Sequence, residues 1–141
     1  MKGIRLHAIW ALLLAAGCSS AGQQWLEGPN VDPLPAADDV QSIEALKLTG
    51  GSRVAFPIPR EQWESVRAAL LPAKVDNRPC SWKLLGHLQV TTRNGKSVYI
   101  QLFQTESGPG AFAAGPTLED REYYRGGKTA DVINVLNGDR K

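Results

Sequence analysis

The chain is poor in the residues that most often carry out catalysis or hold metal ions. Its 141 residues include only two cysteines, two histidines and one methionine. His7 and Cys18 lie near the N-terminus, so Cys80 and His87 are the only cysteine and histidine in the rest of the chain. A zinc site built from histidine and cysteine takes three or four such ligands. We therefore expect neither a metal ion nor another cofactor.

Long hydrophobic runs are also missing. The first uncharged apolar run, residues 8–16, reads AIWALLLAA, whereas a membrane-spanning helix needs about 20 apolar residues. This run follows the positive charges of Lys2 and Arg5 and ends at small residues, which is the arrangement of a secretory signal peptide. We expect residues 1–17 to be a signal peptide that is removed.

The residues at the end of this run carry a more specific motif. Residues 14–18 read Leu-Ala-Ala-Gly-Cys, and this segment resembles the lipobox of bacterial lipoproteins. The resemblance implies that Cys18 receives diacylglycerol, that the chain is cut before it, and that the new amine is acylated. Ser19 stands where the family's inner-membrane retention signal has aspartate, which implies an outer-membrane location facing the periplasm. Two or more acyl chains give stable membrane anchoring. The alternative to a lipoprotein is a secreted protein that is cut before Cys18 and carries no lipid.

An excess of charge of one sign is absent as well. The chain has 16 lysines and arginines against 14 aspartates and glutamates, and removal of Lys2 and Arg5 leaves 14 of each. A neutral domain without a basic run lacks the electrostatic footprint of a nucleic-acid binder. The expected partners are the membrane, through the lipid on Cys18, and an envelope protein, and we expect no nucleic acid.

The mature chain divides into a tether and one domain. Residues 18–39 contain several glycines and prolines and few bulky apolar residues, which predicts an extended, flexible tether after the lipidated cysteine. Residues 40–141 form one α+β domain of roughly 100 residues. A lipidated Cys18 leaves Cys80 without a disulfide partner, so packing must stabilise this domain. We expect a small antiparallel sheet of about four to five strands with two helices packed on one face.

Local patterns place most of these elements. Residues 40–49 and 53–58 read as two strands joined at Gly50-Gly51, although the apolar spacing from Val40 also fits a helical turn. Residues 59–73 read as a helix with an apolar stripe, residues 111–115 as a short strand, and residues 117–122 as a loop. A last helix runs from an N-cap at Thr129 to a stop at Gly138. The apolar stripes of the two helices are Trp63, Val66 and Leu70, and Val132, Ile133 and Leu136.

The strongest local signal is a hairpin over residues 82–105 around Asn94-Gly95. A two-residue turn would mix polar and apolar residues on both faces, so we predict a three-residue loop, 93–95, with Gly95 left-handed. This register gives an aliphatic face with Val90–Val98, Leu88–Ile100 and Gly86–Leu102, continued by Leu84, and a second face with Thr91–Ser97, Gln89–Tyr99, His87–Gln101 and Leu85–Phe103.

Two segments carry weak signals of chemistry. His87 could act as the base for a nucleophile, but it lies in the middle of a strand, and the chain has no G-x-S-x-G sequence. Gly126, Gly127 and Lys128 resemble the end of a phosphate-binding loop, yet Glu122 stands where that motif requires glycine. The two glycines before a helix could still offer N–H groups to an anion.

Three functional hypotheses follow from these observations. The first is a non-enzymatic module that docks another envelope component through the outer sheet face. Its candidate contacts are Tyr99, Phe103, Tyr123, Tyr124 and Arg125. The second is a small-ligand or anion sensor built from Arg125, Gly126, Gly127 and Lys128. The third is a minor hydrolase built around His87.

Overall fold

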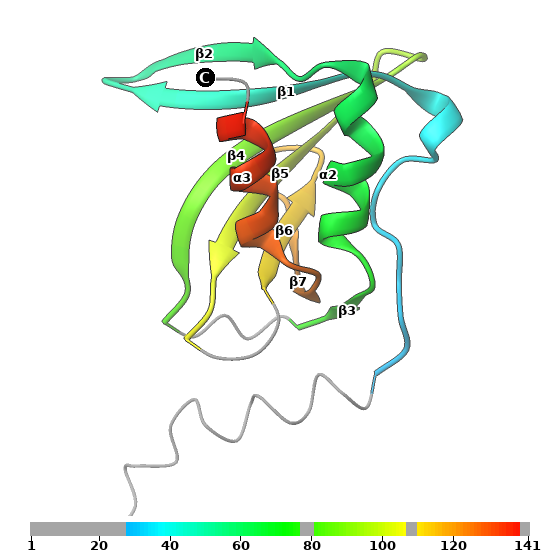
Figure 1. The fold of residues 1–141 in the computed structure, drawn as a ribbon, viewed down its shortest axis with the longest axis vertical. Helices are drawn as coiled ribbons and strands as arrows, with labels where there is room; N and C mark the ends of the chain where they lie inside the picture. The colour runs from blue at the N-terminus through cyan, green and yellow to red at the C-terminus, as the bar shows by residue number, and fades with distance from the viewer. Residues whose placement is uncertain (1–27, 77–80, 107–109, 139–141) are drawn as a thin grey trace, which may run out of the picture.

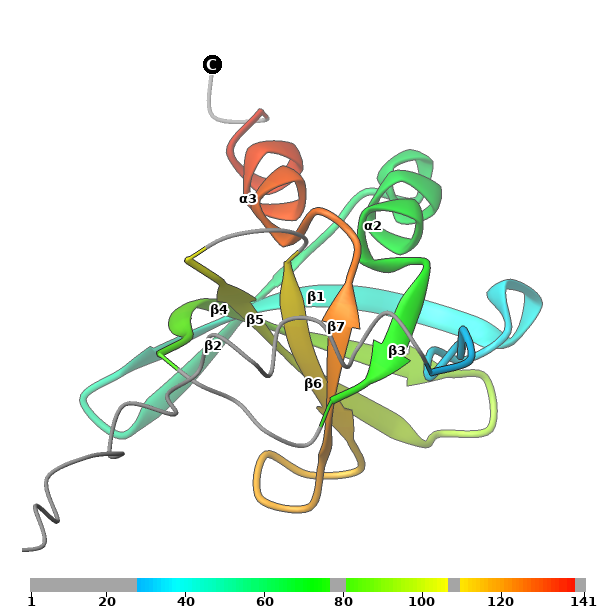
Figure 2. The same ribbon diagram turned by 90° about the horizontal axis from the view of Figure 1, so that it is seen from below.

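The computed structural model describes residues 28–76, 81–106 and 110–138. They form a seven-stranded antiparallel sheet in the order β2-β1-β4-β5-β6-β7-β3, with two α-helices side by side on one of its faces (Figures 1 and 2). The elements are η1 (Ala37–Asp39), β1 (Val40–Thr49), β2 (Ser52–Pro57), η2 (Arg60–Gln62), α2 (Trp63–Leu70), β3 (Ala73–Val75), β4 (Lys83–Thr92), β5 (Ser97–Gln104), β6 (Ala111–Gly115), β7 (Glu122–Gly126) and α3 (Thr129–Gly138). The α+β class is confirmed, but the expected strand number is wrong, because β3 and β7 add two short strands.

The β4–β5 hairpin has the predicted register. Val90 lies opposite Val98, and His87 lies opposite Gln101. The loop closes through the Thr92 N–H, which donates to the Lys96 carbonyl at 2.8 Å, and the Gly95 N–H, which donates to the Thr92 carbonyl at 2.9 Å. Gly95 has a φ of 83°, which favours glycine. The three-residue loop is therefore confirmed.

The start of the hairpin differs from the prediction because β4 contains a bulge between Leu84 and Gly86. A bulge adds one residue to one strand and reverses which face the following side chains occupy. Leu84 therefore lies opposite Phe103, in place of Leu85, and is 47% exposed. Leu85 instead packs against the hydrophobic core.

Helix α2 is shorter than the sequence pattern indicated. It ends at Leu70 rather than at residue 73, and Leu71 is extended with φ −112° and ψ 156°. The cause is Pro72, because the residue before a proline is disfavoured in helical conformation. The next residues form β3, which pairs with β7. Strand β7 begins at Glu122, whereas the sequence pattern predicts a loop over residues 117–122.

Helix α2 carries the chain across one face of the sheet, from β2 at one edge to β3 at the other (Figure 1). Helix α3 packs beside α2 and over β4 and β5. The core lies between this helical layer and the sheet. Its least exposed members include Leu70, Leu88, Ile100, Leu102, Phe112 and Val132, all at 1% or less.

Residues 28–39, which we expected to belong to the tether, lie against the domain. The Val31 N–H donates to the Ala73 carbonyl at 2.8 Å and so extends the sheet beyond β3. Arg67 on α2 donates from Nη1 to the Pro35 carbonyl at 2.7 Å and forms an ion pair with Asp32. This segment therefore forms part of the domain surface.

Candidate functional site

The sheet face opposite the helices, here called the outer face, carries most of the sequence-predicted contacts. Three cross-strand rows of residues make up this face: Leu46, His87, Gln101, Ala113 and Tyr123; Glu44, Gln89, Tyr99 and Gly115; and Leu84, Phe103, Ala111 and Arg125. Ala111 and Ala113 are completely buried, although neither α2 nor α3 lies over this face (Figure 2). Phe103 lies opposite Ala111, and Tyr123 lies opposite Ala113, so larger side chains flank β6 on this face and form a second packed layer.

Three aromatic side chains form the core of that layer, and we call them the aromatic cluster: Trp82, Phe103 and Tyr123. Their ring centroids lie 5.7 Å (Trp82–Phe103), 6.1 Å (Trp82–Tyr123) and 6.2 Å (Phe103–Tyr123) apart. These separations are typical of favourable aromatic packing. All three side chains keep part of their surface accessible, so the cluster both covers β6 and faces solvent.

Next to the aromatic cluster lies a group of polar and cationic side chains, which we call the polar patch: Arg53, His87, Tyr99, Gln101 and Arg121. The Arg53 guanidinium lies 5.2 Å from the centroid of Tyr99. Arg121 donates through Nη2 to the Tyr123 hydroxyl at 2.9 Å. The His87 Nε2 lies 3.2 Å from the Gln101 Nε2. These contacts hold long polar side chains in place on β2, β4 and β5 and at the start of β7.

The polar patch is electrostatically positive. Partial burial lowers the pKa of His87 below its ordinary value of 6.5, and the guanidinium groups of Arg53 and Arg121 lower it further. A neighbouring positive charge disfavours a protonated histidine. The patch therefore presents two arginine charges around a neutral imidazole.

Two buried polar atoms of the outer face have no hydrogen-bond partner within the described part of the chain. They are the indole Nε1 of Trp82 and the side-chain oxygen of Gln101. Most buried polar atoms in folded proteins have a partner, and an unmatched one costs about 1–3 kcal/mol. One such atom lies in the aromatic cluster and the other in the polar patch.

Two of the predicted contacts do not present their side chains on this surface. Tyr124 is 7% exposed and stacks on Phe112 with ring centroids 5.2 Å apart, on the helix side of the sheet. Its neighbour Tyr123 faces outward, because successive residues of a strand point to opposite faces. Arg125 is 8% exposed, and its Nε donates to Asp76 Oδ2 at 3.2 Å. Asp76 is distant in the sequence, so the local pattern could not indicate this burial.

The N–H groups of the glycine turn before α3 form hydrogen bonds within the domain. The N–H groups of Gly126, Gly127 and Lys128 donate to the carbonyls of Gly110, Pro72 and Ala69, respectively, at 2.9, 3.2 and 2.6 Å. Donors engaged in this way are not available to an anion. The absence of a side chain at Gly127 lets the turn approach α2, because a Cβ there would lie 2.2 Å from the Ala69 carbonyl oxygen.

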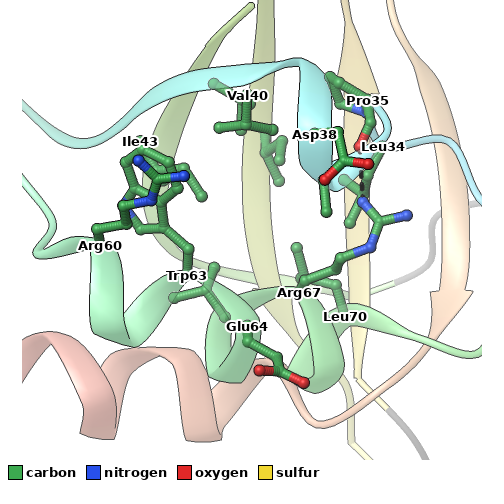
Figure 3. Close-up of a pocket in the computed structure, with 14 residues that line it drawn as sticks. Leu34, Pro35, Asp38, Val40, Ile43, Arg60, Trp63, Glu64, Arg67 and Leu70 are labelled. Carbon is green, nitrogen blue, oxygen red and sulfur yellow. Dashed lines mark hydrogen bonds between the residues drawn. The ribbon is translucent and has the colours of Figure 1, made fainter.

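A groove on the helix face was not predicted from the sequence. It lies between α2, β1 and the segment that leads into η1, and its volume is about 410 Å³. Its floor is aliphatic, and charged side chains stand along its rim (Figure 3). The sequence could not reveal it, because its floor residues read as ordinary core and its wall reads as tether.

The described residues offer few groups for chemistry. His87 makes its side-chain hydrogen bond to Gln101, and no serine or cysteine is bonded to it in that part of the chain. No group of three histidine, cysteine, aspartate or glutamate residues in the same ranges could hold a metal ion. Cys18 and Cys80 lie outside the described residues.

No helix in residues 28–76, 81–106 and 110–138 is both long and apolar enough to cross a membrane. Comparison of the chain with protein-family models, with curated proteins and with solved structures found no match.

Proposed function

We propose that the protein is a lipid-anchored component of the bacterial cell envelope, attached through Cys18, whose domain is a non-enzymatic interaction module. The lipobox-like segment at residues 14–18 supports the anchor. The outer face supports docking, because the aromatic cluster and the polar patch remain partly accessible there. Aromatic and arginine side chains are enriched at protein interfaces.

The observation that carries this proposal is the asymmetry of the sheet. Helices α2 and α3 pack on one face, and neither lies over the other face (Figure 2). That other face carries four partly accessible aromatic side chains, Trp82, Tyr99, Phe103 and Tyr123, and the arginines Arg53 and Arg121. His87 contacts an amide rather than a nucleophile, and the turn at Gly126 uses its own N–H donors. Docking is therefore better supported than hydrolysis or anion sensing.

The proposal can be tested with a photo-crosslinking residue placed in the protein in its native envelope. Position Tyr99 probes the outer face, and Ser65, exposed on α2, is the matched control. We expect one recurrent partner, identified by mass spectrometry, from Tyr99 and not from Ser65. The crosslink should be lost in Arg53→Glu and kept in Arg93→Glu, which changes an exposed hairpin-loop residue.

The same samples test the anchor. Mass spectrometry of the N-terminal peptide should show Cys18 with acyl chains on both sulfur and nitrogen. An unmodified Cys18 would overturn the anchor, and equal crosslinking from Tyr99 and Ser65 would overturn docking through the outer face.

A further inference from the structure

The groove beside α2 is separate from the outer face, because it lies on the helix side of the sheet. Its floor includes Ile43, Val66, Leu70 and Ile100, each no more than 6% exposed. The groove therefore reaches down to the hydrophobic core. Its volume of about 410 Å³ lies in the lower part of the range of about 300–1,000 Å³ that is typical of small-ligand sites.

The two ends of the groove differ in charge. At one end, Arg67 is neutralised by its ion pair with Asp32 and also donates a hydrogen bond to the Pro35 carbonyl. The Asp38 carboxylate points toward the same guanidinium (Figure 3). At the other end stands Arg60, whose guanidinium lies 5.7 Å from the centroid of Trp63. Within the described ranges, Arg60 has no carboxylate partner.

The remaining charged residue at the rim does not neutralise Arg60. Glu64 lies one helical turn after Arg60, but its carboxylate points away from the Arg60 guanidinium in Figure 3. Trp63 is fixed at the same end by its indole N–H, which donates to the Ile58 carbonyl at 2.8 Å. The groove thus combines an aliphatic floor with one exposed cation beside a fixed aromatic wall.

We propose that this groove binds a single-chain fatty acid, with the aliphatic chain along the floor and the carboxylate on Arg60. An ammonium head group in the same place would be repelled, so the site selects an anion. The groove wall is formed by Leu34 and Pro35, on the segment that leads back toward Cys18. A chain anchored by lipid at Cys18 would hold this wall near the membrane, which is a source of fatty acids. Docking through the outer face does not depend on this inference.

The probe is dodecanoate carrying a photoactivatable diazirine at the end of its chain, added to the mature protein in phospholipid vesicles. We expect labelling that excess dodecanoate competes away and that maps to peptides containing Ile43, Val66 or Leu70. Arg60→Gln should weaken labelling by about fivefold, the value expected for loss of one partly exposed charge interaction. Arg93→Gln, an exposed arginine in the hairpin loop, should leave it unchanged.

Three further measurements accompany the labelling experiment, and the first of them separates loss of binding from loss of folding. Circular dichroism should show Arg60→Gln to be folded, because Arg60 is exposed. Val40→Phe, which fills the groove, should also reduce labelling, and a trimethylammonium probe with the same chain should label the groove poorly. The proposal would be overturned by labelling that excess dodecanoate does not compete away or that maps to the outer face. Equal labelling by the two probes, or equal labelling of Arg60→Gln and the unchanged protein, would overturn it as well.

Discussion

Replacing Arg125 with methionine should strongly destabilise the domain, because it would leave the Asp76 carboxylate buried without its guanidinium partner. The side chains of Arg125 and Asp76 are only 10% and 2% exposed, and Nε and Oδ2 lie 3.2 Å apart. Removing one partner of a buried ion pair costs about 3–5 kcal/mol. The Arg125 guanidinium also lies 5.3 Å from the centroid of Trp82, so the variant loses a cation–π contact as well.

Equilibrium urea unfolding of the mature protein, followed by circular dichroism, measures this loss. A cost of this size lowers the urea midpoint by roughly 2 M for a domain of this length. The control is Arg93→Met, in the exposed hairpin loop, which should change the free energy of unfolding by less than about 0.5 kcal/mol.

A double-mutant cycle isolates the pair itself. The double variant Asp76→Leu with Arg125→Met removes both charges together, so it should be more stable than the sum of the two single changes predicts. Equal stability of Arg125→Met and Arg93→Met, or strict additivity in the cycle, would refute the assignment of Arg125 as a buried structural residue.

Three other predictions concern titration and backbone conformation. Burial and the hydrogen bond to Glu122 raise the pKa of Tyr124 to about 12. Ultraviolet absorbance should therefore show a tyrosine that ionises near pH 12, and Tyr124→Phe should remove that step. The stability that Tyr124 contributes is present below its ordinary pKa of 10.0 and is lost as the pH rises from there toward about 12. Burial lowers the pKa of His87, so its contribution to stability is present above about pH 6.5 and lost as the pH falls below it; His87→Gln should flatten the fall in melting temperature between about pH 7.5 and about pH 5.5. Gly127→Ala should cost at least about 2 kcal/mol, more than Gly95→Ala, because both glycines are left-handed but only a Cβ at Gly127 meets backbone within 4 Å; equal losses in thermal unfolding would contradict this.

Local patterns predicted the elements that carry strong local signals. The hairpin register followed from Asn94-Gly95 and from the separation of aliphatic and polar residues, and the structure confirms it. Strand β3 has only three residues after a helical pattern, and β7 reads Glu-Tyr-Tyr-Arg-Gly, with no polar and apolar alternation. Strand β3 pairs with β7, which is a long-range contact that local periodicity does not encode. Strand β7 also pairs with the preceding strand β6.

The candidate site, like the fold, was predictable only where its residues lie on elements with strong local signals. The hairpin register placed Tyr99 on the outer face, and alternation along one strand would have separated Tyr123 from Tyr124. Arg125 looked like a surface charge because its partner Asp76 is 49 residues away. The groove beside α2 depends on the packing of residues 34–38 against a helix, so only the three-dimensional arrangement reveals it.

The contacts of residues 28–39 with the domain limit how far the protein can reach from the membrane. With Cys18 lipidated as proposed, only ten residue steps separate the anchor from Gly28, whose carbonyl accepts a hydrogen bond from the Lys74 side chain at 2.6 Å. Ten fully extended residues span about 35 Å at most, which is comparable with the diameter of a small domain. The domain would therefore operate in a thin layer next to the bilayer, and its partners would have to come within that layer.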